Sequence, residues 1–317
     1  MNLTCDRRQF LKRSTLAASA VTVAASFEER ALLAAAPAAE LAAPKPALPL
    51  PTGKIGGLSV TRLICGGNLI SGFAHSRDLI YVSPLLKHYF TDAKVMETLR
   101  LCEQHGINTT ILRVDNDTIR ILSAYRKEFN SKIQWIAQVT LPSKDPDLDI
   151  KRAIDHGAVA VYVHGGVSDE VVETGRLEPL VRALEVARKN RVPGGIAGHA
   201  VAVPIACEKA KLTPDFFMKT LNAKNYWSAG PMPRFDSVWE ETPRETIAFM
   251  TEVEKPWIAY KVLGAGAIHP RQGFAYAFEN GADFVCVGMF DFQVAEDVQI
   301  AREAIDRANV RQRPWCA

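Results

Sequence analysis

The chain has 317 residues, of which 48% are hydrophobic and 23% are charged, and its formal net charge is +3. This balance predicts a packed core rather than a disordered chain. Beyond the first residues the sequence has no basic tract of the kind that would indicate binding to nucleic acid. The cysteines form no CxxC or metal-finger spacing, so we expect Cys65, Cys102, Cys207 and Cys286 to be small buried side chains.

Residues 1–36 resemble an export signal. Arg7 and Arg8 precede Phe-Leu-Lys, and an uncharged run rich in Ala and Val follows from Ser14 to Ser26. A basic start and a short apolar stretch are typical of a secretory signal, whereas a membrane span needs about 20 apolar residues. The paired arginines resemble the bacterial twin-arginine signal, with Asp6 where Ser or Thr is usual. This resemblance implies the twin-arginine export machinery as a partner, a periplasmic or otherwise exported protein, and no stable membrane span in the mature form.

An Ala/Pro-rich segment, residues 37–51, is interpreted as a linker, and residues 52–317 are expected to form one domain. Short apolar runs alternate there with amphipathic helical segments. The expected strands are Arg62–Gly66, Ile107–Arg113, Ile133–Thr140, Ala158–His164, Val192–Gly198, Asp215–Leu221, Trp257–Leu263 and Asp283–Gly288. The expected helices are Asp92–His105, Asp117–Phe129, Asp147–His156, Asp169–Lys189, Val203–Ala210, Thr242–Val253, Arg271–Asn280 and Val294–Ala308.

Nearly continuous apolar strands indicate a parallel sheet covered by helices. Eight strand-helix units in one domain predict a single (β/α)8 TIM barrel of the α/β class. An open doubly wound sheet would usually show a Gly-rich loop after its first strand, and Cys65-Gly66-Gly67-Asn68 does not match that motif.

Polar side chains follow the expected strands at their carboxyl ends, where TIM barrels place catalytic groups. A merely structural barrel does not need such a set, so the pattern favours a polar pocket for a small-molecule substrate. The candidate substrate-binding residues at these ends are Asn68, Arg113, Asp115, Gln138, Asn222 and Asp291. The candidate catalytic residues are His164, His199, Lys219 and Lys261.

Several segments resemble aldo/keto reductases. The phrase from Lys54 to Gly67 is similar to the opening of that family, and Leu99–Asn108 is similar to its helix-Gly-Ile-Asn lead into the second strand. Val161-Tyr162-Val163-His164 resembles the fourth strand, so the resemblance implies that His164 is the family's catalytic histidine. It also implies a TIM barrel, with NADP(H) as a cofactor to consider.

The same segments depart from the family's Asp-Tyr-Lys-His tetrad. Ile111 stands at the Asp position, no Tyr follows it, and the third strand ends Gln138-Val139-Thr140 instead of in Lys. Hydride transfer to a carbonyl needs a proton donor poised on the oxygen. We therefore expect that ordinary nicotinamide-dependent carbonyl reduction is not the activity, and a reductase with His164 as its acid is the main alternative.

The strands Asp215–Thr220 and Ala259–Gly266 resemble the paired lysine strands of class I aldolases of the deoxyribose-phosphate type. There one Lys forms a Schiff base and a neighbouring cation lowers its pKa, which implies these roles for Lys219 and Lys261. The candidate phosphate- or anion-loop glycines are Gly264, Gly266 and Gly288. The alternative is that both lysines pair with carboxylates in a buried ion network.

His164 and His199 close neighbouring strands. Two imidazoles can exchange protons, bind a divalent metal or hydrogen-bond to loop carbonyls, and no HxH or HExxH spacing favours the metal. Two long connections, Asn68–Phe90 and Asn222–Trp239, are interpreted as loops, and the second as a substrate lid. Its candidate substrate contacts, suited to a sugar-like molecule, are Tyr226, Trp227 and Arg234.

Together these patterns predict an exported TIM-barrel enzyme that acts on a small carbonyl-bearing or sugar-like substrate. The expected chemistry is acid/base or lysine-assisted, of the lyase or isomerase kind. No cofactor is assigned, and NADP(H) or a divalent metal remains open. A non-catalytic barrel that binds a small ligand is the other alternative.

Overall fold

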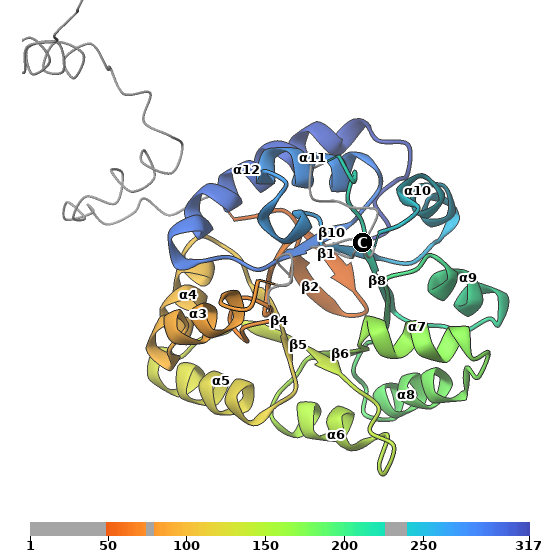
Figure 1. Cartoon of the computed structure of the whole chain (residues 1–317), viewed down its shortest axis with the longest axis horizontal. Helices are drawn as coiled ribbons and strands as arrows, with labels where there is room; N and C mark the ends of the chain where they lie inside the picture. The colour runs from red at the N-terminus through yellow and green to blue at the C-terminus, as the bar shows by residue number, and fades with distance from the viewer. Residues whose placement is uncertain (1–48, 74–78, 226–239) are drawn as a thin grey trace, which may run out of the picture. The chain divides into compact units, whose positions relative to one another are not determined.

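The computed structural model describes residues 49–73, 79–225 and 240–317 (Figure 1). Eight parallel strands close into a barrel in the order β10-β3-β4-β5-β6-β7-β8-β9. They are β3 (Leu63–Gly66), β4 (Thr109–Arg113), β5 (Gln134–Val139), β6 (Ala160–Val163), β7 (Gly194–Gly198), β8 (Phe216–Thr220), β9 (Trp257–Tyr260) and β10 (Phe284–Val287). All eight expected strands are present, and the prediction of a TIM barrel is confirmed.

Helices cover the outside of the barrel, as Figure 1 shows. They are α3 (Val82–Tyr89), α4 (Asp92–Gln104), α5 (Asn116–Phe129), α6 (Leu148–Asp155), α7 (Gly165–Glu173), α8 (Glu178–Lys189), α9 (Ala202–Lys209), α10 (Pro243–Glu252), α11 (Pro270–Glu279) and α12 (Val294–Arg307). The 3-10 turns are η1 (Gly264–Gly266), η2 (Asp291–Gln293) and η3 (Ala308–Val310). In the part of the chain that the structure describes, no helix is long and apolar enough to cross a bilayer.

Two expectations about helices were wrong. The single helix expected over Asp169–Lys189 is two helices, α7 and α8, because Gly175 adopts a left-handed φ of +69° between them. Moreover, α7 begins immediately after strand β6 and places Asp169 in its middle. The segment Asn68–Phe90 is not entirely loop, since α3 occupies its last third.

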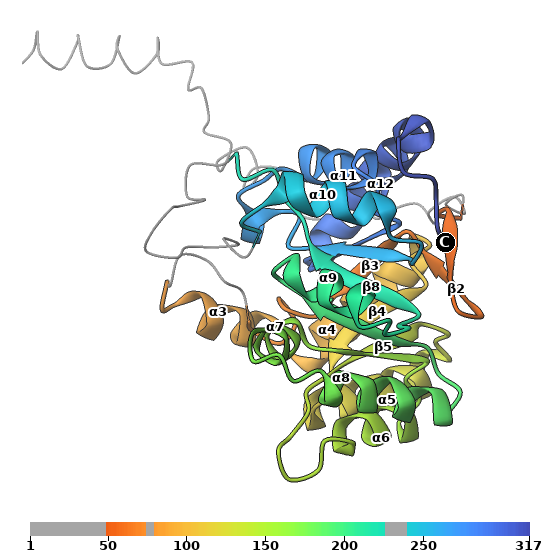
Figure 2. The ribbon, with the colours of Figure 1, turned by 90° about the vertical axis from the view of Figure 1, so that its right-hand side faces the viewer.

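A hairpin that the sequence pattern did not indicate closes the amino end of the barrel. Strands β1 (Thr52–Ile55) and β2 (Leu58–Thr61) pair antiparallel, and Ile55 and Val60 are fully buried. Both side chains pack with the residues that fill the barrel interior, such as Phe284 at the start of β10. Figure 2 shows the hairpin at one end of the barrel and α3 on the opposite side. The hairpin therefore covers the amino end of the barrel.

The barrel interior is filled by side chains at alternate positions of the strands, as expected for a packed barrel. Ile64, Ile111 and Ile136 form one side of this cluster, with Phe216 opposite. A Cβ on Gly195 would lie 2.4 Å from the Phe216 ring, so the large ring requires a glycine on the neighbouring strand. The four cysteines expected to be buried are buried in this core or in the helix layer.

The C-terminal segment is held at the hairpin end by a buried carboxylate. Asp283 receives ion pairs from Arg313, at 2.8 Å, and Arg311, at 3.1 Å, and all three side chains are at most 2% exposed. The Trp315 ring lies between two guanidinium groups, with Arg311 3.4 Å and Arg62 3.7 Å from its centre. This cluster attaches the end of the chain to strand β10 and the start of β3.

Candidate active site

Two histidines stand side by side at the carboxyl end of the barrel. His164 directly follows β6 and His199 directly follows β7, and their ring centres are 6.3 Å apart. His199 Nδ1 lies 2.6 Å from a carboxylate oxygen of Asp169 in α7. The backbone amides of His199 and Ala200 donate to the same carboxylate, at 3.0 and 3.2 Å. Asp169 therefore fixes both the ring of His199 and the turn that carries it.

Burial lowers the pKa of both imidazoles below the usual value of 6.5. For His164, the nearby His199 and Lys261 lower the pKa further. For His199, the hydrogen bond with Asp169 raises the pKa and so opposes the effect of burial, whereas Lys261 again lowers the pKa. Both rings are consequently neutral at pH 7, the form in which an imidazole can accept a proton.

Lys261 completes this group from strand β9. It follows the last strand residue in a left-handed conformation, with a φ of +57°. Its carbonyl accepts hydrogen bonds from Asn222 Nδ2, at 3.3 Å, and from the amide of Gly264, at 3.2 Å. Burial lowers the pKa of the Lys261 ammonium to about 8. The structure thus brings Lys261 together with both histidines, and the buried Asn222 supports its backbone, while its substrate-binding role stays a prediction.

Lys219 lies in a different environment. Phe216 and Met218 point into the barrel, so the alternation of the strand directs Lys219 toward the helix layer. Its Nζ forms an ion pair with Glu240 at 2.8 Å, and both side chains are only 1% exposed. Nζ also donates to the carbonyl and hydroxyl oxygens of Thr220. The catalytic role of Lys219 stays a prediction, and this enclosed ion pair favours the structural alternative.

Tyr260 is a site residue that the sequence reasoning missed. It ends strand β9 and its ring centre lies 5.6 Å from that of His199. Its hydroxyl is fully buried and has no hydrogen-bond partner among the described residues. Burial raises its pKa well above 10. An orphaned hydroxyl costs stability, so its persistence at a strand end is typical of a functional site.

Three predicted substrate-binding residues lie at the ends of β4 and β5. Arg113 pairs with Asp115, at 3.1 Å, and its guanidinium lies 4.8 Å from the centre of the Phe73 ring. Asp115 also accepts the amide of Thr118 and so caps α5. Gln138 accepts a hydrogen bond from the hydroxyl of Tyr162 inside the barrel, at 3.0 Å. Of these, Arg113 is close enough to the histidines to lower the pKa of His164.

Asn68 and Asp291 follow β3 and β10. Asn68 is exposed in the turn after β3, where its carbonyl accepts the amide of Phe73. Asp291 accepts hydrogen bonds from the hydroxyl of Tyr89 and from Lys94 Nζ, the latter at 3.0 Å. Its carboxylate therefore ties the last loop to α3 and α4, and its role as a substrate contact stays a prediction.

Two of the three glycines predicted to bind phosphate use their amides within a turn. Gly264 donates to the carbonyl of Lys261, and Gly266 donates to the carbonyl of Leu263 at 2.9 Å. Gly288 packs against Leu69, because a Cβ there would lie 2.9 Å from that side chain. These roles stay predictions. The predicted lid residues Tyr226, Trp227 and Arg234 lie outside the described residues.

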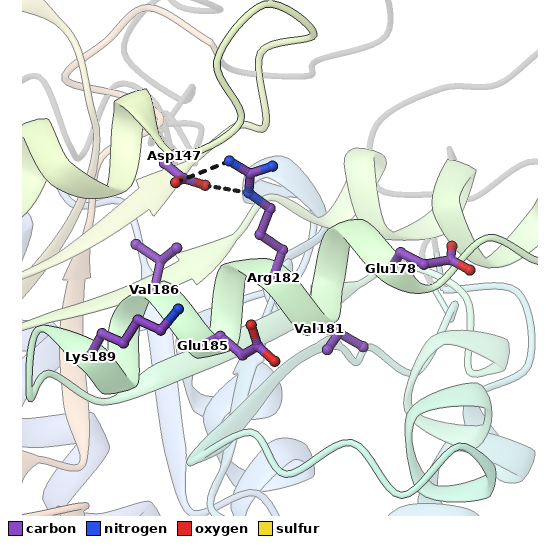
Figure 3. A pocket seen from close by; sticks show the side chains of 7 residues that line it. All are labelled: Asp147, Glu178, Val181, Arg182, Glu185, Val186 and Lys189. Carbon is purple, nitrogen blue, oxygen red and sulfur yellow. Dashed lines mark hydrogen bonds and ion pairs between the residues drawn. The ribbon is translucent and has the colours of Figure 1, made fainter.

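No metal centre is seen in the described ranges, where no three His, Cys, Asp or Glu side chains gather in a way that could hold an ion. A groove of about 450 Å³ lies along α8. Figure 3 shows the side chains that line it, among which Asp147 pairs with Arg182 at 2.8 Å. The groove lies away from the carboxyl ends of the strands and contains no His, Cys, Ser or Tyr. We therefore place the candidate active site at His164, His199 and Lys261.

Two signals in the sequence could have found the missed residues. Strand alternation from the interior Ile258 places Tyr260 in the barrel, next to Lys261. Asp169 lies five residues after His164 in the sequence. If a helix starts directly after β6, as α7 does, this spacing brings Asp169 within reach of His199 at the end of β7. Glu240 could not be found in this way, because it is brought to Lys219 across a long connection.

No family model and no curated protein sequence matches this chain. Two solved structures from Pseudomonas aeruginosa, each provisionally assigned as an aldo-keto reductase, are similar in fold. Each is 18% identical to this chain, with TM-scores of 0.57 and 0.56. Each match covers 80% of this chain and 94% or 95% of the solved structure. A phospho-2-dehydro-3-deoxyheptonate aldolase from Thermotoga maritima has a TM-score of 0.51 at 10% identity, covering 83% of this chain and 75% of the other. At such identities the similarity shows the TIM-barrel fold alone.

Proposed function

We propose that this protein is an enzyme that transfers protons on a small carbonyl-bearing substrate, with lyase or isomerase chemistry. The observation that carries the proposal is the hydrogen bond of 2.6 Å between His199 and Asp169, beside His164 and Lys261. His164 and His199 follow the neighbouring strands β6 and β7, Asp169 lies in α7, and Lys261 follows β9, at the end of the barrel where TIM-barrel enzymes place their sites.

Asp169 gives His199 its role. A carboxylate that accepts the proton on Nδ1 holds the ring in the tautomer whose Nε2 accepts a proton, and stabilises the imidazolium that forms. His199 is thus the general base that removes a proton from the carbon beside a carbonyl. His164, the second imidazole, is placed to return a proton to the substrate at another atom.

Lys261 supplies the electrophile. With a pKa of about 8, it is largely an ammonium at pH 7 and can stabilise the negative charge that develops on a carbonyl oxygen. Its neutral fraction is large enough to form an imine with the same carbonyl. Lys219 is proposed to be structural, because the ion pair with Glu240 keeps it away from solvent.

The test separates these roles with matched variants of the whole chain. Borohydride trapping with pyruvate, dihydroxyacetone and keto sugars is expected to label wild type and a Lys219→Met/Glu240→Gln variant, but not Lys261→Met. Exchange of the substrate's α-protons in deuterated water is expected to fall about 100-fold or more in His199→Asn. Unchanged exchange in His199→Asn would refute the proton-transfer role, and full activity in Lys261→Met would remove the lysine from the site.

An aldo/keto reductase activity is the second candidate, and the fold similarity is what favours it. The residues present do not fit that family's proton relay: Ile111 faces the barrel interior and Gln138 is bonded to Tyr162. Tyr260 is a poor replacement acid, because its pKa is raised. Tight binding of NADPH with turnover of simple aldehydes would make this candidate the better one.

A binding protein without chemistry is the third candidate. It would keep its affinity for a small ligand in His199→Asn and Lys261→Met and show no exchange in wild type. Its lid would include Trp227, so Trp227→Ala would lower ligand affinity while leaving the fold intact. We also propose export through the twin-arginine route, on the basis of Arg7 and Arg8.

A further inference from the structure

The first turn of α7 presents unused backbone donors at the candidate active site. The helix starts with Gly165-Gly166, and its N-cap residue His164 makes no side-chain capping bond. Among the described residues, no hydrogen bond is found for the amides of Gly165, Gly166 and Val167, and the helix's first bond is from Ser168 to the carbonyl of His164. Gly166 is exposed. Unpaired amides at a helix start attract anions.

The neighbouring side chains add positive charge. Lys261 and Arg113 both act on His164, the residue that precedes this turn. Asp169, a carboxylate that acts on His164, is bound by the ring of His199 and by the amides of His199 and Ala200. These bonds offset part of its negative charge, and no acidic residue lies in the first turn of α7.

Tyr260 supplies a second, independent observation. A Cβ on Gly165 would lie 2.6 Å from the Tyr260 hydroxyl oxygen, so this buried and unpartnered hydroxyl is directed at the start of α7. The same Cβ would lie 3.0 Å from the ring of His199, so the space here admits only a glycine. A donor that lacks an acceptor, next to three amides that also lack one, indicates that an oxygen-bearing ligand completes the site.

We infer that the amides at the start of α7 bind the carboxylate of the substrate, which makes the substrate a 2-oxo acid or a similar small oxo acid. This inference rests on the proposed function, because it places the carbonyl next to the carboxylate and so beside Lys261 and His199. The two oxygens of a carboxylate match two consecutive amides of a helix start.

A phosphate group fits this site less well. Asp169 lies close enough to act on His164, and its charge repels a dianion more than it repels a carboxylate. Among the described residues, the cations that act on His164 are Lys261 and Arg113, and Arg113 already pairs with Asp115 at 3.1 Å. The first turn of α7 therefore favours a monoanion.

The test measures binding to the full-length protein by calorimetry, with pyruvate, its neutral isostere pyruvamide, and inorganic phosphate. Pyruvate is expected to bind at least about 10-fold more tightly than pyruvamide. Gly166→Asp places a carboxylate on the turn, and Gly166→Asn is its neutral control of the same shape. Gly166→Asp is expected to weaken pyruvate binding at least about 10-fold relative to Gly166→Asn.

Equal affinities for pyruvate and pyruvamide, equal effects of the two substitutions, or no binding of pyruvate would overturn the inference. Tighter binding of phosphate than of pyruvate would overturn the assignment to a carboxylate. The proposed function is read separately, by exchange of the methyl protons of pyruvamide in His199→Asn and wild type. Binding of pyruvate without proton exchange would refute the proposed function and leave the carboxylate site at the start of α7 intact. Proton exchange without selectivity for the anion would refute the carboxylate site and leave the proposed function intact.

Discussion

Removing the charge of Lys219 should show that this lysine stabilises the fold and performs no chemistry. Its Nζ lies 2.8 Å from Glu240 Oε2, with both side chains 1% exposed. At an effective dielectric constant of about 20, that separation gives an attraction of about 6 kcal/mol before desolvation of the two ions is subtracted. Lys219→Met removes the cation, keeps most of the side-chain volume and leaves the carboxylate buried.

The expected loss of unfolding free energy in Lys219→Met is about 3–5 kcal/mol, the usual cost of leaving one buried charge without its partner. Glu240 keeps its other bonds, from the amide of Thr242 and the hydroxyl of Thr246, both at 3.2 Å. Glu240→Gln retains an acceptor for these donors and removes the charge. The double variant Lys219→Met/Glu240→Gln should therefore lose only about 1–2 kcal/mol.

Urea unfolding of wild type, both single variants and the double variant measures the coupling between the two residues. A loss below about 1 kcal/mol in Lys219→Met would refute the buried ion pair, because it lies below the range for such pairs. Losses that simply add in the double variant would refute the pairing as well. A double variant that unfolds like wild type but no longer traps with borohydride would return Lys219 to the chemistry.

Three further predictions concern other parts of the chain. Because the pKa values of His164 and His199 are lowered in the folded protein, the unfolded chain takes up protons more readily below pH about 6.5. The unfolding free energy should therefore fall as the pH drops from 7 to 5. This fall should be less steep in the variant His164→Asn/His199→Asn than in a control variant with the exposed His156→Asn. Asp283→Asn should lower the unfolding free energy by about 3–5 kcal/mol, because it leaves Arg311 and Arg313 buried without their carboxylate. The side chain of Asp117 is 80% exposed, so the control Asp117→Asn should lower it by less than about 0.5 kcal/mol. Chemical unfolding measures both losses. Arg7→Lys/Arg8→Lys should leave precursor in the cytoplasm, while Arg13→Lys should not, and cell fractionation that shows unchanged export would contradict the twin-arginine interpretation.

The sequence was sufficient for the barrel because each strand is a short apolar run between helices with recognisable ends. The same regularity brought His164, His199 and Lys261 to one end, since carboxyl ends of parallel strands in a barrel share an edge. The hairpin β1–β2 was missed because its four-residue strands lack a long apolar alternation, and Ile55 and Val60 become core residues only when the barrel exists to receive them.

The side-chain partners could not be read in the same way. Lys219 and Lys261 look equivalent in the sequence, yet one faces the helix layer and the other the site, because a left-handed turn at Lys261 interrupts the alternation of its strand. Asp115 caps α5 and Asp291 binds Lys94, contacts that the sequence did not indicate, and their role as ligand contacts stays a prediction. Such choices depend on which acceptor the fold brings nearest, and that is a property of the packed structure.

The hydroxyl of Tyr260 offers the sharpest test of whether the site awaits a ligand. An unpartnered buried hydroxyl costs about 1–3 kcal/mol, so Tyr260→Phe should leave the unfolding free energy unchanged or raise it by about 1 kcal/mol. Tyr125→Phe is the matched control: Tyr125 is fully buried and its hydroxyl donates to Glu103 at 2.5 Å, so its loss should lower the unfolding free energy by about 1–2 kcal/mol. With saturating pyruvate the gain in Tyr260→Phe should disappear, because the ligand then supplies the hydroxyl with an acceptor in wild type. Equal losses in the two variants without ligand would mean that Tyr260 already has a partner, and the argument for a ligand at the start of α7 would lose its second support.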